Sequence, residues 1–143
     1  MTMRFLRMGV VLIGTFCLAA QCGAASPNLK QQLASQQFSG TLDGNVKFTS
    51  LGAVHCGAEN LHVIFYEWNE SPPPGEAVHA SYRIIVMDGE RYLGSYVVQD
   101  KPKLQDGVLR FPYSADGDSI GCGREGVLPG KVLLDGEIVP LAK

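Results

Sequence analysis

Apolar and polar residues alternate with a period of two along much of this chain, the pattern of half-buried β-strands. The alternation is clear in residues 46–51, VKFTSL. Residues 61–68, LHVIFYEW, are rich in β-branched and aromatic residues and apolar at positions of both parities. This segment predicts a central strand that is covered on both faces. Three consecutive prolines, residues 72–74, end it.

Asp-Gly dipeptides separate several of the predicted strands, and this dipeptide favours the type I′ turns that join antiparallel strands. One hairpin is predicted at residues 82–98 around Asp88-Gly89, and another at residues 131–141 around Asp135-Gly136. A further strand is predicted at residues 108–111, and a Gly-rich loop at residues 114–130. Six or seven short strands with these turns predict an all-β fold, a small antiparallel β-sandwich or barrel.

The region before the first predicted strand has a different pattern. Residues 27–38, PNLKQQLASQQF, place Leu29, Leu33 and Phe38 where they could share one helix face. The same segment is also compatible with a disordered leader. We therefore expect three parts: a signal peptide at residues 1–25, a helical or disordered leader at residues 26–44, and the β-domain at residues 45–143.

The N-terminal segment has the three parts of a secretory signal. Arg4 and Arg7 precede an apolar run at residues 8–20, and small residues follow up to Ala25. The run is shorter than the ~20 residues that a membrane-spanning helix needs. Cleavage after Ala25 predicts a periplasmic or secreted protein of the bacterial envelope. The alternative is a lipid anchor on Cys22, because residues 18–22, LAAQC, loosely resemble a lipobox.

Two of the four cysteines, Cys56 and Cys122, lie beyond the predicted signal peptide. Two cysteines in an oxidising compartment have one possible intramolecular pairing. The sequence therefore predicts a Cys56–Cys122 disulfide. A redox pair is the alternative, but such pairs are more often a CxxC motif, which the chain lacks.

Composition and charge narrow the function. Residues 26–143 carry ten Lys and Arg and fourteen Asp and Glu, a net charge of −4, which disfavours binding to nucleic acids. With 45% hydrophobic and 18% charged residues, the chain is expected to fold rather than to stay disordered.

The sequence offers little catalytic chemistry. It has no G-x-S-x-G nucleophile motif and no phosphate-binding Gly loop followed by a helix. Its three histidines are His55, His62 and His79. Asp116 and Asp118 begin a calcium-like D-x-D-x-x-G loop, but the acidic ligand of the twelfth position is missing. His55, Asp116 and Asp118 are weak candidates for a metal site, and no cofactor is expected.

Aromatic residues are the main candidates for binding, because amphipathic rings are enriched at interface hot spots. The expected binding residues are Trp68, Tyr66, Tyr92, Tyr96 and Tyr113. The loops at residues 72–74 and 114–130 could present them at one end of the domain. The alternative is that these rings fill the core, as aromatic residues usually do in a small β-domain.

Two fragments, VIFYEW at residues 63–68 and RYLGSY at residues 91–96, resemble strands in the outer-membrane lipoprotein of type VI secretion systems. The resemblance covers under a tenth of the chain and implies a transthyretin-like sandwich, with no site residue carried over.

These observations lead to three hypotheses of function. The first is a secreted or periplasmic non-enzymatic binding protein, like an inhibitor or immunity module, that docks a protein or an envelope glycan. The second is a structural lipoprotein of an envelope or secretion complex, anchored through Cys22. The third is a metal carrier or hydrolase that uses His55, His62, His79 and the Asp116–Asp118 loop.

Overall fold

The computed structural model describes residues 28–114 and 117–143. The predicted signal peptide, its cleavage site, Cys22 and Asp116 lie outside the described residues. Within them the protein is mostly β-strand, in antiparallel sheets, with one short helix. The predicted all-β class is therefore confirmed. No described helix has the length and hydropathy that crossing a membrane requires.

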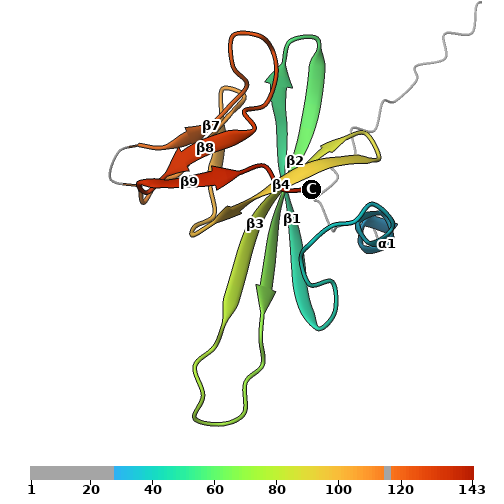
Figure 1. Ribbon diagram of the computed structural model, residues 1–143, viewed down its shortest axis with the longest axis vertical. Helices are drawn as coiled ribbons and strands as arrows, with labels where there is room; N and C mark the ends of the chain where they lie inside the picture. The colour runs from blue at the N-terminus through green and yellow to red at the C-terminus, as the bar shows by residue number, and fades with distance from the viewer. Residues whose placement is uncertain (1–27, 115–116) are drawn as a thin grey trace, which may run out of the picture.

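A four-stranded antiparallel sheet is the centre of the fold (Figure 1). Its strands follow one another in chain order: β1 (Asn45–Cys56), β2 (Glu59–Asn69), β3 (Ala80–Asp88) and β4 (Arg91–Val98). The predicted central strand is β2, which pairs with β1 on one side and with β3 on the other. The sheet has two edges, β1 and β4. The connection between β2 and β3, with its prolines, projects beyond the end of the sheet (Figure 1).

Five short strands follow the main sheet in the chain. Strands β5 (Lys103–Gln105), β6 (Val108–Arg110) and β7 (Ser119–Ile120) form one small sheet, and β8 (Lys131–Leu134) and β9 (Glu137–Pro140) form a hairpin. The described residues thus contain nine strands, more than the six or seven expected. The expected count was too low because strands of two or three residues have no measurable period. The three sheets remain separate and do not close into a barrel.

The turns follow the predicted chemistry with one exception. Asp106-Gly107 and Asp135-Gly136 each have positive φ at both residues, as a type I′ turn requires. At the β3–β4 hairpin, however, Asp88 belongs to β3, and the turn residues are Gly89 and Glu90. Only Gly89 has a positive φ, 57°, so this turn is not the predicted type I′ turn. Asp88 instead forms an ion pair with Arg91 across the turn, at 2.6 Å.

Both faces of the main sheet are covered, which explains why β2 is apolar at positions of both parities. On one face, Leu61, Val63 and Phe65 belong to a core that includes Leu109, Ile120, Val132 and Leu134 from the short strands. On the other face, Ile64 and Tyr66 belong to a second core with residues of the helix. Figure 1 shows the helix on one side of the sheet and β7, β8 and β9 on the other.

The helix α1 (Asn28–Ser35) confirms the helical version of the predicted leader. Leu29 and Leu33 are buried on the side of the helix that packs against the sheet, as their spacing predicts. Phe38 is buried in the same core but not on a helix face, because the helix ends at Ser35 and Gln37 has a positive φ of 62°. The Phe38 ring meets the Tyr66 ring edge-on, with 5.4 Å between the centroids. The Gln36 side chain accepts a hydrogen bond from the Tyr92 backbone N–H at 2.7 Å. The helix is therefore held on the sheet by both apolar and polar contacts.

Candidate binding surface

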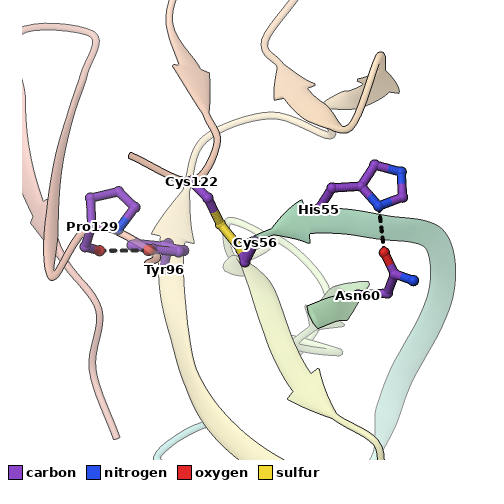
Figure 2. The surroundings of a disulfide bond; sticks show 6 residues. All are labelled: His55, Cys56, Asn60, Tyr96, Cys122 and Pro129. Atoms are coloured by element: carbon purple, nitrogen blue, oxygen red, sulfur yellow. Dashed lines mark hydrogen bonds between the residues drawn. A yellow bond between two sulfur atoms is a disulfide. The ribbon is translucent and has the colours of Figure 1, made fainter. Parts of the chain in front are cut away.

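The predicted disulfide is present between Cys56 and Cys122, whose Cα atoms are 5.3 Å apart. Cys56 is the last residue of β1, and Cys122 follows β7 (Figure 2). The bond joins the main sheet to the loop between β7 and β8. The β1–β2 turn and the loop after β7 also approach closely beside the disulfide, because a Cβ atom on Gly126 would lie 3.1 Å from Gly57. A side chain at position 126 would therefore push the loop away from the β1–β2 turn.

The three histidines are separate from one another in their contacts. His55 Nδ1 donates a hydrogen bond to Asn60 Oδ1, on the side of β1 that faces away from the disulfide (Figure 2). His62 Nε2 is paired with Ser50 Oγ at 2.7 Å. His79 is exposed in the connection between β2 and β3. In residues 28–114 and 117–143, no three His, Cys, Asp or Glu side chains gather as metal ligands would.

Asp118 connects two loops. One of its carboxylate oxygens, Oδ2, accepts a hydrogen bond from the Asp135 backbone N–H at 2.6 Å. The contact ties the start of β7 to the turn between β8 and β9. Asp118, the second aspartate of the calcium-like motif, therefore has a structural contact that explains its carboxylate. The first aspartate of that motif, Asp116, is outside the described residues.

Three of the five candidate binding aromatics lie inside the protein. Tyr66, Tyr92 and Tyr96 are at most 7% exposed, and each hydroxyl has a hydrogen-bond acceptor. Tyr66 donates to the Thr41 carbonyl at 2.6 Å, and Tyr92 donates to Ser95 Oγ at 3.1 Å. Their rings are packing groups of the two cores, with satisfied polar ends.

Tyr96 has the most perturbed chemistry of the three tyrosines. Its hydroxyl donates to the Pro129 carbonyl at 2.6 Å (Figure 2). Pro129 belongs to the part of the chain that contains the short strands β5 to β9, which we call the second layer. Burial raises its pKa to about 12, because the phenolate would lose its hydration. Burial also raises the pKa of Tyr66 and Tyr92, although Arg83 nearby opposes the effect at both. All three rings are therefore neutral at physiological pH.

The other two candidate aromatics reach the surface. Trp68 is half-buried near the end of β2, where it packs against the helix-side core. Tyr113 is 81% exposed in the connection between β6 and β7. These two rings come from different parts of the fold. No interaction that the structure describes brings them into one site with the three buried tyrosines.

A groove lies between the end of β4 and the β8–β9 hairpin, and we call it the β4 groove. It has a volume of about 330 Å³. Its walls are mainly apolar, with two carboxylates and one amide, and they contain no His, Cys, Ser or Lys among the described residues. The lining residues are Val97, Val98, Gln99, Phe111, Leu134, Asp135, Glu137, Ile138, Val139 and Pro140.

Exposed apolar side chains lie in the wall of this groove and next to it. Val97 is 46% exposed, Leu133 is 61% exposed and Ile138 is 71% exposed. Leu133 and Ile138 are cross-strand partners in the β8–β9 hairpin, so their side chains form one apolar pair. Three of the six large exposed hydrophobic residues in the described chain thus lie in or beside the groove. Such a concentration is typical of a protein-binding surface.

The prediction of binding residues from aromatics did not include this surface. Its sequence signal is the run Val132, Leu133, Leu134 opposite Ile138 and Val139, which is apolar at positions of both parities. In β2 the same signal marks burial on two faces. In the β8–β9 hairpin only Val132 and Leu134 are buried, so Leu133 remains on an uncovered face.

Comparisons with known proteins identify no relative. No protein-family model, curated protein sequence or solved structure matches this chain significantly. The resemblance of residues 63–68 and 91–96 to type VI secretion lipoproteins therefore gains no support from them.

Proposed function

We propose that this protein is a secreted or periplasmic, non-enzymatic binding protein that docks a partner protein at the β4 groove. The observation that carries the proposal is the concentration of exposed apolar side chains at that groove, where Ile138 is part of the wall and Leu133 is its cross-strand neighbour. A disulfide is typical of proteins of oxidising compartments, which supports a location outside the cytoplasm.

The chemistry of the groove favours a protein over an envelope glycan. Sugars are bound through many polar groups and exposed aromatic faces, whereas the only aromatic ring of the groove, Phe111, is 7% exposed. The exposed apolar side chains at the groove, Val97, Leu133 and Ile138, are aliphatic. Aliphatic side chains gain binding free energy by burying an apolar surface of the partner, at roughly 25 cal/mol per Å². Protein surfaces supply such area, and glycans supply less of it.

The experiment is an affinity capture with the full chain, carrying a C-terminal tag on a flexible linker and purified in its oxidised form. Extracts of envelope and culture medium are passed over the parent and over the double variant Leu133→Lys with Ile138→Lys. Both positions are exposed, so the variant is expected to fold like the parent. A stoichiometric protein that the parent retains and the variant loses supports the proposal. Equal capture by both, or a glycan as the only retained molecule, contradicts it.

The second hypothesis, a structural lipoprotein anchored through Cys22, is decided on the same purified material. The intact mass of the protein reports its processing. A chain that begins at Ser26 is the processed secreted form, whereas a diacyl adduct on Cys22 identifies a lipoprotein. Either form can present the β4 groove, so the mass assigns the location and the capture assigns the activity.

A further inference from the structure

We infer that the partner binds as an extended segment that adds a strand to the free edge of β4 at Val97, with a basic side chain facing Asp135 and Glu137. This inference rests on the proposed function and specifies its mode and its partner chemistry. Strand addition draws affinity from backbone hydrogen bonds and specificity from alternate side chains in a groove. Both components are present beside β4.

The edge of β4 already accepts an added residue from this chain. The Ser95 backbone N–H donates to the Ala142 carbonyl at 2.7 Å, and the Ala142 N–H donates to the Ser95 carbonyl at 2.9 Å. Ser95 therefore directs both of its backbone groups away from β3. Because this direction alternates along an antiparallel strand, Val97 also directs its N–H and carbonyl to the open edge.

The C-terminal segment does not continue along this edge. Two residues before Ala142, the antiparallel register would place Pro140 opposite Val97, but proline has no backbone N–H to donate. Pro140 instead pairs with Lys131 in the β8–β9 hairpin. The Leu141 N–H donates to the Gly130 carbonyl at 2.8 Å, which turns the chain toward β8. The β4 groove occupies the space that opens between β9 and the edge of β4.

The groove suits one face of an added strand. In a strand, alternate side chains lie on the same side, so every second side chain of the partner would enter the groove. The apolar lining includes Val98 and Phe111, together with Leu134 and Val139 of the β8–β9 hairpin. A volume of about 330 Å³ is at the lower end of the range for small-ligand sites, which fits a short apolar segment.

The charge of the groove selects the partner. Asp135 and Glu137 both line it. Among the described residues the only ion pair joins Arg91 to Asp88, so neither groove carboxylate has a cationic neighbour within 4 Å. A Lys or Arg of the partner would meet both carboxylates at the end of the apolar wall. Such complementarity contributes to specificity and to the association rate. The favoured partner segment alternates apolar and polar residues and carries one basic residue.

The experiment uses a library of random heptapeptides displayed on phage and selected on the oxidised full chain. We expect enriched peptides to alternate β-branched or aromatic residues with polar ones and to include Lys or Arg. The enriched peptides are then synthesised and titrated by fluorescence anisotropy. The Val97→Pro variant should bind these peptides at least tenfold more weakly than the parent does, because proline removes the backbone N–H that is directed to the open edge. Proline is tolerated on an edge strand where the N–H does not pair inside the sheet.

Two controls separate the backbone and the charge contributions. Val97→Thr keeps the amide and the β-branched shape, so it should bind like the parent. The double variant Asp135→Asn with Glu137→Gln should bind severalfold more weakly and lose most of its salt dependence. Asparagine accepts the φ of 50° at position 135. Neutralising two exposed acids elsewhere, Asp43→Asn with Glu76→Gln, should change neither quantity.

Amide hydrogen exchange on the parent tests the inference even if Val97→Pro fails to fold. Binding of an enriched peptide should slow exchange at Val97 and leave Ser95 unchanged, since its N–H is already bonded to Ala142. Absence of enrichment, enrichment of acidic peptides, or unchanged exchange at Val97 would overturn strand addition. If Leu133 and Ile138 are needed to capture a partner but Val97→Pro captures it equally, the docking function stands and this mode is wrong.

Discussion

Removal of the Cys56–Cys122 disulfide is expected to cost a large part of the stability of this protein. The bond joins residues that are 66 positions apart in the chain. In the chain-entropy model, a cross-link that closes a loop of this length stabilises the native state by about 4 kcal/mol at 25 °C. Small domains have only about 5–15 kcal/mol of unfolding free energy. The double variant Cys56→Ala with Cys122→Ala should therefore be close to the limit of folding.

The assay is urea unfolding followed by far-UV circular dichroism at pH 7. With an m value of about 2 kcal/mol per M, a loss of 4 kcal/mol lowers the unfolding midpoint by about 2 M. The melting temperature should fall by on the order of 15 °C. The double substitution is used in place of a single one because it leaves no unpaired thiol.

The parent protein under reducing conditions is the matched control, and its unfolding curve should coincide with that of the double variant. A double variant that unfolds within about 1 kcal/mol of the oxidised parent would refute the reasoning. That result would mean that the unfolded chain gains little freedom when the bond is absent. It would also mean that the apolar contacts and hydrogen bonds of the second layer hold it on the sheet without the covalent bond.

Three further substitutions test the packing. The pKa of Tyr96 is raised from 10.0 to about 12, so its stabilising contribution is complete below pH 10 and is lost as the pH rises from 10 to 12, by about 3 kcal/mol. Urea midpoints measured from pH 8 to pH 11.5 should fall less steeply for Tyr96→Phe, whereas Tyr113→Phe, at an 81% exposed position, should behave like the parent. Gly94→Ala should destabilise the protein by about 2 kcal/mol in thermal melts, because Gly94 has a φ of 153° and a Cβ there would lie 2.8 Å from the Leu141 side chain. The control Gly130→Ala, where a Cβ would meet nothing within 4 Å, should change the stability by no more than about 0.5 kcal/mol. Leu33→Ala should cost about 3 kcal/mol, since Leu33 is fully buried under the helix, and differential scanning calorimetry measures that loss.

The main sheet could be predicted from the sequence because burial of alternate side chains is a local signal. In β2, apolar residues at both odd and even positions predicted burial on two faces, and each face packs against its own hydrophobic core. The helix was predictable for a similar reason, since the spacing of Leu29 and Leu33 places both on one face. The same sequence is compatible with a disordered leader, because eight residues give only about two helical turns.

The short strands and one turn were beyond this kind of prediction. β7 contains only Ser119 and Ile120, so it has no period to read and exists because β6 lies beside it. At Asp88-Gly89 the dipeptide favoured a type I′ turn, but pairing of Asp88 with Arg91 extends the ladder by one pair. The turn then begins one residue later. Cross-strand pairing decided the register, and the dipeptide did not.

The exposure of the aromatic residues depends on tertiary contacts that no local pattern contains. Tyr96 and Tyr113 have the same chemistry, yet one is fully buried and the other is 81% exposed. Along β4, alternation does not predict the face on which a tyrosine packs. Tyr92 and Tyr96 are four residues apart, yet Tyr92 belongs to the core on the helix side and Tyr96 to the core on the opposite side. The β4 groove is also tertiary in origin. It exists because Ala142 pairs with Ser95 of β4, whereas Pro140, two residues earlier, pairs with Lys131 of β8 and leaves the edge of β4.

The position of the groove relative to β4 depends on a small number of ties. The second layer contains strands of only two to four residues, whose backbone ladders are too short to fix its place alone. Its connections to the main sheet include the Cys56–Cys122 bond, the Ser95–Ala142 bridge and the hydrogen bond from Tyr96 to the Pro129 carbonyl. Two of these three ties start on β4 itself. Because β4 supplies both the edge and the anchors of the opposite wall, the groove and the edge should move as one unit. A substitution that loosens the Ser95–Ala142 bridge or the hydrogen bond from Tyr96 to Pro129 should therefore weaken peptide binding, even when the groove residues are unchanged.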